Sequence, residues 1–487
     1  ELYKEVPQIG RAVTALTNSD YSSGSSYLKN CYLVFNSDYS DDSMYCTFLE
    51  RSKQCLDLYV ADLCELSYDS SNVFKDYNVR YSKRVNESVN VYFSKNLHGC
   101  TDCFGCFNLK NKQYHIFNKP YSKEDYFKTL EKFDLGSYKF VQEMKEKMAK
   151  LEQGFPKRYA EGLNNTNVIG DLIFNSKDCF YCNEVGDCEN CKWTHFMSIA
   201  STKDSYDYMM WGGGAELMYE CMGAGGGANN VRFCYMCWGA TTNMEYAKDI
   251  LKGTDDVFGC SSLKKKRFCI LNKQYTEKEF HDLRAKIIEH MDKMPYVDSK
   301  GRVYKYGEFF PADVSHYAYN ESMAQAFFPL SKAEALRQGY KWRDLETARY
   351  KATMKSAQLP DHIKDVPDSI VKEVIECEHT GECLEQCPTA FKITQQELDF
   401  YRRQSIPLPR LCHNCRHYGR FLSRNHISKL WPGKCRCAGA KSSGGEYLNQ
   451  GEHFHGTSKC PNEFQTPYSP EKSNILYCEQ CYKEEVI

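Results

Sequence analysis

Residues 104–126 read FGCFNLKNKQYHIFNKPYSKEDY, and residues 258–280 read FGCSSLKKKRFCILNKQYTEKEF. The two segments align without a gap. They share Phe-Gly-Cys at the start and, further on, Asn-Lys with a tyrosine two residues later. Self-similarity of this kind indicates that the chain contains two copies of one structural unit.

A helix is predicted to follow each copy. Ser122 and Thr276 are good N-cap residues, and each has an acidic residue three positions later, as in a capping box. The charged stretches that follow predict helices from Ser122 to Gln153 and from Thr276 to Lys293.

The region upstream of each copy is rich in Cys, Tyr, Asn, Ser and Asp and has little helical periodicity. Short β-type stretches such as 32–34 and 89–92 alternate with turn residues. Cysteines recur at nine-residue intervals in both regions: Cys46, Cys55 and Cys64, and then Cys179/Cys182 and Cys188/Cys191. Short strands and turns at a fixed period predict a β-solenoid whose inward residues stack in ladders. Two irregular Cys-rich domains are the alternative.

Composition excludes several classes of protein. The 487 residues carry a formal net charge of -1 and 42% are hydrophobic, as in a soluble globular chain rather than a disordered one. No apolar run approaches the roughly 20 residues of a membrane span. The first residue is Glu1 and no charged-then-apolar leader follows, so we expect a fragment or a processed product.

Cysteine is abundant, at 26 residues, and much of it occurs as Cys-x-x-Cys. This spacing suits metal ligation better than a disulfide framework. It therefore predicts Zn²⁺ as the cofactor and a reducing, cytoplasmic location.

Two cysteine knuckles form the first expected zinc ribbon: Cys383 with Cys387, and Cys412 with Cys415. Four cysteines on two knuckles provide the tetrahedral thiolate set that Zn²⁺ favours. Cys377 and His379 compete for a position in this set.

The second expected ribbon ends in a Cys-x-x-Cys knuckle, and its other half is less clear. Its predicted ligands are Cys437, Cys460, Cys478 and Cys481. Cys435 and His455 are the alternatives, because a neutral imidazole ligates as readily as a thiolate.

Both ligand sets are closed, which is typical of structural rather than catalytic zinc. No Ser/His/Asp or Cys/His catalytic set can be assembled, so we expect a protein that is not an enzyme. A knuckle-like spacing also makes four upstream cysteines alternative metal ligands: Cys179, Cys182, Cys188 and Cys191. A packed interior ladder, in which cysteine acts as a small hydrophobe, is the competing interpretation and the one that the nine-residue recurrence favours.

Given these ligand sets, the expected fold is mixed β and α, with two duplicated β-solenoid-like lobes, each followed by a helix, and then C-terminal zinc ribbons. The predicted boundaries are 1–153 and 154–295 for the lobes with their capping helices, 296–370 for a helical or linker region, and 371–487 for the tandem ribbons.

Residues 401–436 lie between the ribbons and contain no acidic residue. Their cations alternate with aromatic residues, an arrangement that suits phosphate contact together with base stacking. The predicted nucleic-acid-binding residues are Arg402, Arg403, Arg416, Arg420, Arg424 and Lys429. A solvated or protein-facing basic surface is the alternative.

Several motifs occur together in this chain: Phe104-Gly-Cys…Asn111-Lys-Gln-Tyr114, Tyr319-Asn-Glu…Phe328-Pro-Leu, Gly339-Tyr-Lys-Trp342, Phe400-Tyr-Arg…Leu408-Pro-Arg-Leu-Cys412 and Tyr477-Cys-Glu-Gln-Cys-Tyr482. With this combination the chain resembles an uncharacterised family of Cys-rich zinc-ribbon, β-solenoid-repeat proteins of uncultivated small-genome bacteria and metagenomes. The resemblance implies zinc ribbons and a repeat region, and it implies no activity.

The leading functional hypothesis is a non-enzymatic zinc-binding scaffold whose ribbons contact nucleic acid or a nucleoprotein. The first alternative is a structural or interaction protein of a surface, viral or multiprotein assembly, homo-oligomeric or with protein partners, in which pairs such as Phe327-Phe328 make the contacts. The second is a carbohydrate-active β-helix enzyme, which needs a carboxylate cluster on one ladder.

Overall fold

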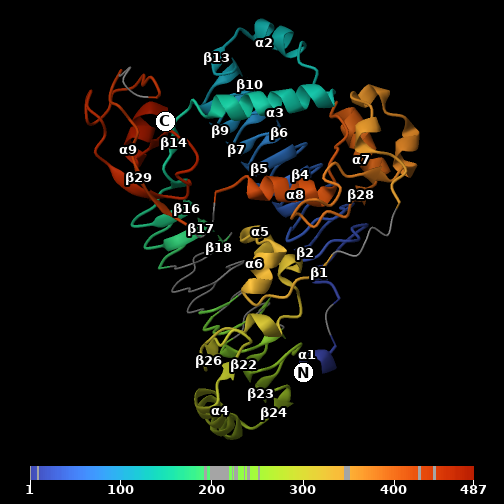
Figure 1. Cartoon of the computed structure of the whole chain (residues 1–487), viewed down its shortest axis with the longest axis vertical. Coiled ribbons are helices and arrows are strands. Elements are labelled where there is room, and N and C mark those ends of the chain that lie inside the picture. Colours follow the sequence, from blue (N-terminus) through green and yellow to red (C-terminus); the bar gives the residue numbers. More distant parts are fainter. Residues whose placement is uncertain are drawn as a thin grey trace.

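A stack of parallel strands forms the centre of the molecule, and helices lie against it on several sides (Figure 1). The computed structural model describes residues 2–7, 10–190, 195–197, 219–221, 223, 229–234, 236–237, 242–250, 253–344, 351–425, 429–441 and 446–486. Cys191 of the sequence-based predictions lies outside the described residues.

The first stack is a β-solenoid in which each coil contains twelve residues. Leu56 pairs with Tyr68 and Val73 with Val85, both in parallel register, so each strand meets the residue one coil later. The named strands are β1 (Val13–Thr14), β2 (Ser25–Ser26), β3 (Thr47–Glu50), β4 (Leu56–Asp62), β5 (Tyr68–Phe74), β6 (Tyr77–Arg80), β7 (Lys83–Asn86), β8 (Val89–Tyr92), β9 (Lys95–His98), β10 (Thr101–Phe104), β11 (Phe107–Lys110) and β12 (Gln113–Ile116). The predicted β-solenoid is confirmed.

A triplet of residues generates each side of the coil. Every third residue has a positive φ, for example Asn36, Tyr39 and Asp42. Such a left-handed residue turns the chain at a corner, and Asn and Asp tolerate it best among residues with a side chain. The predicted nine-residue recurrence of cysteine is therefore three triplet steps, and residues that stack directly are twelve apart.

Small polar side chains satisfy the backbone inside the coils. The Ser37 hydroxyl accepts a hydrogen bond from the Leu49 backbone N–H at 2.9 Å, and the Ser94 hydroxyl accepts one from the Cys106 N–H. Inward thiols make the same kinds of contact: Cys46 Sγ accepts the Leu58 N–H and donates to the carbonyl oxygen of Cys55, both at 3.4 Å. Since buried N–H groups need an acceptor, a small side chain that can accept, serine or cysteine, suits these inward positions. The ladder interpretation of the upstream cysteines agrees with these contacts.

A second stack of parallel strands occupies residues 162–274 among the described residues. Its strands are β15 (Gly162–Leu163), β16 (Ile169–Phe174), β17 (Phe180–Gly186), β18 (His195–Met197), β19 (Met236–Cys237), β20 (Met244–Glu245), β21 (Lys248–Ile250), β22 (Asp255–Phe258) and β23 (Arg267–Ile270), with β24 (Lys273–Gln274) antiparallel to β23. The first stack ends in the same way, with β13 (Lys119–Pro120) antiparallel to β12. The two matched sequence segments thus both end in a parallel strand, a short antiparallel strand and a helix, while their origin by duplication stays a prediction.

Helices follow both hairpins, as predicted, but the first is interrupted. Ser122 caps α2 (Lys123–Leu130), and Ser137 caps a separate helix, α3 (Tyr138–Glu152). The break lies where the chain passes close to another segment, because a Cβ on Gly136 would lie 2.5 Å from the His362 ring. The single helix predicted from Ser122 to Gln153 is therefore wrong, whereas α4 (Glu277–Lys293) begins with the expected capping box.

The C-terminal third consists of short elements placed around the first solenoid (Figure 1). In chain order the remaining elements are α1 (Leu2–Glu5) and β14 (Lys157–Arg158), then β25 (Tyr296–Val297), β26 (Val303–Tyr304), α5 (Met323–Phe327), α6 (Lys332–Arg337), β27 (Ile375–Glu376), β28 (Ala390–Phe391), α7 (Gln395–Arg403), α8 (His413–Leu422), β29 (Trp431–Lys434), β30 (Glu463–Thr466), β31 (Leu476–Tyr477) and α9 (Glu479–Val486). Five short 3-10 helices are also present among the described residues: Ala312–Val314, Tyr319–Glu321, Ser356–Gln358, Ile363–Asp365 and Asp368–Lys372. No helix within the described ranges is long and apolar enough to span a membrane.

One inward position of the first solenoid carries a carboxylate, and it makes the stability depend on pH. Asp76 is 3% exposed and accepts hydrogen bonds from the Ser88 N–H at 2.7 Å and the Phe74 N–H at 2.9 Å. Burial nevertheless raises the pKa of Asp76 to about 7. The folded chain therefore holds a proton that the unfolded chain releases above a pKa of about 3.9, and stability falls as the pH rises from there through 7.

Asp76→Ser is expected to remove this dependence, because a serine hydroxyl can accept from the Ser88 N–H as serines do elsewhere in the coils. Between pH 5 and pH 8 the unfolding free energy of the wild type should fall relative to that of the variant by roughly 3 kcal/mol, and its thermal midpoint should fall with it. Parallel pH profiles for the two proteins would show that Asp76 does not titrate in this range.

Candidate metal centres

Four thiols of the first cysteine module, which we define as residues 375–422, converge at one point. Cys377, Cys387, Cys412 and Cys415 are buried, and their sulfur atoms all lie within 4.8 Å of one another. Cys377 Sγ is 3.8 Å from Cys415 Sγ, and Cys412 Sγ is 3.9 Å from Cys387 Sγ. A tetrahedron with Zn–S bonds of about 2.3 Å has edges of about 3.8 Å, so these thiols fit a thiolate-bound zinc ion.

Local structure fixes the positions of these sulfurs. Cys377 and Cys387 flank the facing strands β27 and β28, while Cys412 is the N-cap of α8 and Cys415 lies in its first turn. Cys377 Sγ accepts the Cys412 backbone N–H at 3.2 Å, and Cys412 Sγ accepts the Cys415 N–H at 3.5 Å. Such N–H donors stabilise thiolates, as a metal knuckle requires.

This group differs at one position from the sequence-based set. Cys377 occupies the place that we assigned to Cys383, whose Sγ lies outside the tetrad but 3.8 Å from Cys415 Sγ. The preference for Cys383 came from the Cys-x-x-x-Cys spacing alone. The pairing of β27 with β28 places Cys377 at the site, and these strands are only two residues long each, so the sequence does not indicate them.

The second cysteine module, which we define as residues 431–441 and 446–486, contains another group of four thiols. Cys435, Cys460, Cys478 and Cys481 lie within 4.8 Å of one another, and the Cys460 and Cys478 sulfurs are 3.8 Å apart. Contacts with Cys435 and Cys481 hold the pKa of the Cys478 thiol well below its usual value. Cys437, chosen from the sequence, is replaced here by Cys435 and lies beside His453 and His455 instead.

Three of the four upstream cysteines that could have been ligands lie in the core of the second stack. Cys179, Cys182 and Cys188 are buried among Ile173 and Val185. The thiols of Cys179 and Cys188 donate to backbone carbonyls at 3.3 and 3.2 Å. None of the three belongs to a metal-type cluster within the described part of the chain, which agrees with their interpretation as packing residues.

Three of the arginines predicted to bind nucleic acid are buried against the solenoid. Helix α8 lies across β4 and β5, and Asp57 of β4, whose side chain is 0% exposed, lies 2.8 Å from Arg416 and 3.0 Å from Arg420. The two arginine side chains are 9% and 5% exposed. Arg424, 12% exposed, lies 3.5 Å from Glu184 of the second stack. The expectation that these three contact phosphate is corrected by their burial, because the guanidinium groups face carboxylates of the same chain.

The other three predicted cations are on the surface. Arg402 pairs with Asp368 at 2.5 Å, and Arg403 donates to the Gln54 side chain at 3.2 Å. The Lys429 ammonium lies 5.1 Å from the centre of the Trp431 ring. Nucleic-acid contact through these three residues stays a prediction.

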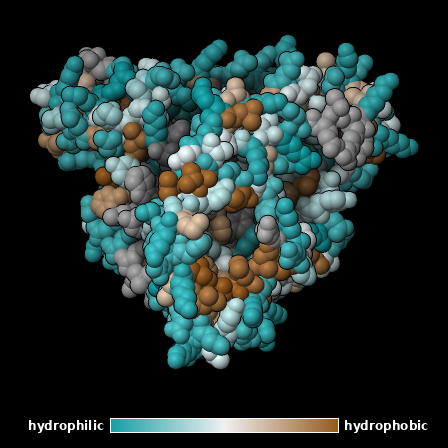
Figure 2. Space-filling view, turned by 60° about the horizontal axis from the view of Figure 1, so that its bottom comes forward, coloured by the Kyte–Doolittle hydropathy of each residue, from teal (hydrophilic) through white to brown (hydrophobic). Residues whose placement is uncertain are grey.

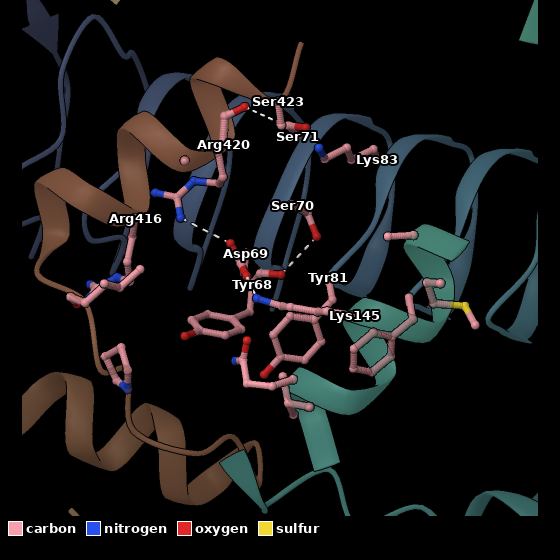
Figure 3. Close-up of a pocket in the computed structure, with 18 of the residues that line it drawn as sticks. Tyr68, Asp69, Ser70, Ser71, Tyr81, Lys83, Lys145, Arg416, Arg420 and Ser423 are labelled. Atoms are coloured by element: carbon pink, nitrogen blue, oxygen red, sulfur yellow. Dashed lines mark hydrogen bonds and ion pairs between the residues drawn. The ribbon is translucent and has the colours of Figure 1, made fainter. Parts of the chain in front are cut away.

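A cavity of about 470 Å³ lies where α3, α8 and the face of the solenoid meet (Figure 3). Figure 3 shows Lys145 of α3 and Arg420 of α8 pointing toward Asp69, at 2.6 and 3.3 Å. Burial alone would raise the pKa of Asp69, but these two cations outweigh it and hold that pKa below its usual value. Glu152, which also lines the cavity, has its pKa lowered to about 2 by Lys95 and Lys157 against the effect of burial.

These carboxylates do not suit the carbohydrate-active alternative. A glycoside hydrolase needs one carboxylic acid with a raised pKa as its proton donor. Asp69 and Glu152 both have their pKa lowered by neighbouring cations, so neither of these two carboxylates suits the role of proton donor.

Comparisons with known proteins add little to this geometry. No protein-family model matches the sequence, and no curated protein matches it. Among solved structures, a chain described as an acetyltransferase of Desulfovibrio desulfuricans G20 is similar over 61% of this chain and 87% of its own length, with 10% identity and a TM-score of 0.11. A similarity this weak carries no argument about fold or function.

The buried ion pairs beneath α8 predict a measurable effect on stability. Asp57→Asn leaves Arg416 and Arg420 facing a neutral amide, and loss of one partner from a buried ion pair typically destabilises by about 3–5 kcal/mol. Urea unfolding of the purified chain should show a loss of this size. The matched control is Asp20→Asn, because the Asp20 side chain is 84% exposed and its loss should change stability by less than about 0.5 kcal/mol. Equal stability of the two variants would mean that α8 is held by other contacts.

Proposed function

We propose that the chain is a non-enzymatic zinc-binding scaffold, in which two metal-bearing cysteine modules fasten helices to one β-solenoid. The observation that carries this proposal is the pair of four-thiol groups with sulfur–sulfur distances of 3.8–3.9 Å. A closed set of four thiolates leaves no open coordination position, which suits a structural role rather than catalysis.

Zinc is the best-fitting ion for these groups. Soft thiolate ligands in a tetrahedral arrangement select zinc or iron over hard cations such as Mg²⁺ and Ca²⁺. The N–H donors around the thiols and their burial serve either metal, so absorbance in the visible range separates iron, which is coloured, from zinc, which is not.

Each module connects its thiol group to the solenoid. In the first, Cys412 and Cys415 start α8, and Arg416 and Arg420, about one and two turns after Cys412, reach Asp57. In the second, β31 pairs with β14, and the Tyr482 hydroxyl on α9 lies 3.2 Å from the Asn108 side chain of β11. A metal that fixes the start of either helix therefore also fixes the position of the helix on the solenoid.

The proposed scaffold has a binding partner, and two classes of partner are considered: nucleic acid and protein. Nucleic acid would have to meet the exposed cations Arg402, Arg403 and Lys429. A protein partner would meet apolar surface, which Figure 2 shows as brown groups among mainly hydrophilic residues. Phe327, expected as one such contact, is 4% exposed and packs against the Phe421 ring, so it belongs to the interior.

Elemental analysis of the purified full chain tests the metal. We expect at least one tightly bound zinc ion per module, and Cys412→Ser should lower the zinc content and the thermal stability together. The matched control is Cys55→Ser, because Cys55 lies in the solenoid interior and the Ser43 hydroxyl accepts its N–H, so serine suits this environment. A chain that binds no metal, or a Cys412→Ser variant that keeps all of it, would contradict the proposal.

Binding to single-stranded DNA or RNA at several salt concentrations separates the partner classes. If the partner is nucleic acid, the triple variant R402A/R403A/K429A should bind more weakly and with a flatter salt dependence, by up to roughly three counterions. A stable homo-oligomer that does not bind nucleic acid would instead favour the assembly class.

A further inference from the structure

A second group of ligand-type atoms lies directly beside the four thiols of the second cysteine module. Cys437, His453, His455 and Cys481 have one sulfur or nitrogen atom each within 4.8 Å of the others. Cys437 Sγ is 3.6 Å from His453 Nδ1, and Cys481 Sγ is 3.2 Å from His455 Nε2. Two sulfurs and two imidazole nitrogens are a common zinc-ligand set.

Cys481 belongs to both groups. Its side chain is fully buried in the first turn of α9, and its sulfur faces the Cys435, Cys460 and Cys478 thiols as well as the two histidines. We infer that the second cysteine module binds two metal ions that share the Cys481 thiolate. This inference rests on the proposed metal binding and extends it from one ion to two.

The histidines are oriented as metal ligands are. The ring nitrogen of His455 that faces away from Cys481, Nδ1, lies 2.7 Å from the Ser458 carbonyl oxygen. His453 Nε2 lies 3.2 Å from a Glu485 carboxylate oxygen, and the Glu485 side chain is 1% exposed. In His455 one nitrogen is thus held by an oxygen acceptor while the other faces Cys481, which fixes the tautomer that ligation requires. In His453 the Glu485 oxygen holds Nε2, and Nδ1 faces Cys437.

Further contacts support the same arrangement. The Gln450 and Gly451 backbone N–H groups donate to Glu485, so its carboxylate is itself held in place. The buried Asn449 side chain donates to Cys437 Sγ at 3.2 Å. One other anionic group is near, because a Glu484 oxygen lies 3.4 Å from His453 Nδ1 and could serve as an additional ligand.

The net charge of this buried cluster favours two metal ions over one. Four thiolates around one divalent ion carry a net charge of -2 and leave Cys437 with no metal, whereas five thiolates around two ions carry -1. Since uncompensated buried charge is unfavourable, the shared thiolate lowers the electrostatic cost of the cluster.

The first cysteine module repeats this layout, which indicates that the second group is not an accident of packing. His379, Cys383 and Glu385 gather around Cys415, which is also a member of the four-thiol group. His379 Nδ1 and a Glu385 oxygen lie 3.9 Å apart, and neither of these buried atoms has a hydrogen-bond partner among the described residues. Buried polar atoms of this kind need a partner, and a metal ion provides one.

The test compares the zinc content of the full chain with that of the double variant H453A/H455A. We expect the variant to hold one ion fewer per chain, because the four-thiol site keeps all its ligands. The matched control is H281A/H290A, which removes two exposed histidines of α4 and should leave the content unchanged. An unchanged content in H453A/H455A would overturn the inference and leave the proposed function intact, whereas a wild type without metal would overturn both.

A second measurement does not depend on the folding of any variant. Wild-type protein loaded with ¹¹³Cd should give, for the second module, one resonance in the range of four sulfur ligands and one in the range of mixed sulfur and nitrogen ligands. Scalar coupling between these two resonances is expected, because they share the Cys481 sulfur. Two uncoupled resonances, or a single four-sulfur resonance for this module, would overturn the shared thiolate.

Discussion

The hydrogen bond from a backbone N–H to the side chain stacked one coil earlier is the interaction on which the rest of this structure depends. Each coil turns at every third residue, and a corner residue with positive φ is unfavourable by roughly 1–2 kcal/mol when it is not glycine. The ladder bonds and the serine hydroxyls that accept buried N–H groups offset this strain. Without these hydrogen bonds the strain at the corners would not be offset, the coils would not form, and α3 and α8 would have no flat face to pack on.

On that face basic side chains of α3 and α8 point inward, toward the solenoid. Asp57 and Asp69 lie on strands of the solenoid, and they hold Arg416, Arg420 and Lys145 from two different helices. Basic residues that the sequence suggests as a nucleic-acid-binding surface thus form the ion pairs that join the helices to the solenoid. Asp69 also lines a polar cavity, where the helices meet the solenoid through long side chains such as Lys145 and Arg420.

The sequence was informative about the fold where the constraint is local. The two matched segments correctly indicated that a helix follows each copy, and Ser122 and Thr276 correctly located the helix starts. The helix break before Ser137 could not be foreseen, because it depends on the close approach of His362, more than 200 residues away. The coil length was obscured because cysteine appears at only some inward positions, so the nine-residue spacing was more visible than the twelve-residue one.

For both candidate metal sites the sequence predicted four cysteine ligands, but in each it chose one cysteine that lies outside the four-thiol group. Cys-x-x-Cys spacing identifies knuckles such as Cys412–Cys415 and Cys478–Cys481, since both sulfurs of a knuckle follow from one local turn. The choice between Cys377 and Cys383, or between Cys435 and Cys437, depends on how distant strands meet. The burial of Arg416 and Arg420 was equally invisible, because nothing near them in the sequence shows that Asp57 lies below.

The twelve-residue coil also governs how a protein of this kind can change over evolutionary time. Loss or gain of one whole coil keeps every inward residue in its column and every corner residue at a corner. Loss of a single residue would move serines to the corners and tyrosines to the interior of all the coils beyond it. The first solenoid should therefore differ among lineages by whole coils, whereas the second stack, in which paired residues lie eleven to thirteen positions apart, tolerates irregular insertions.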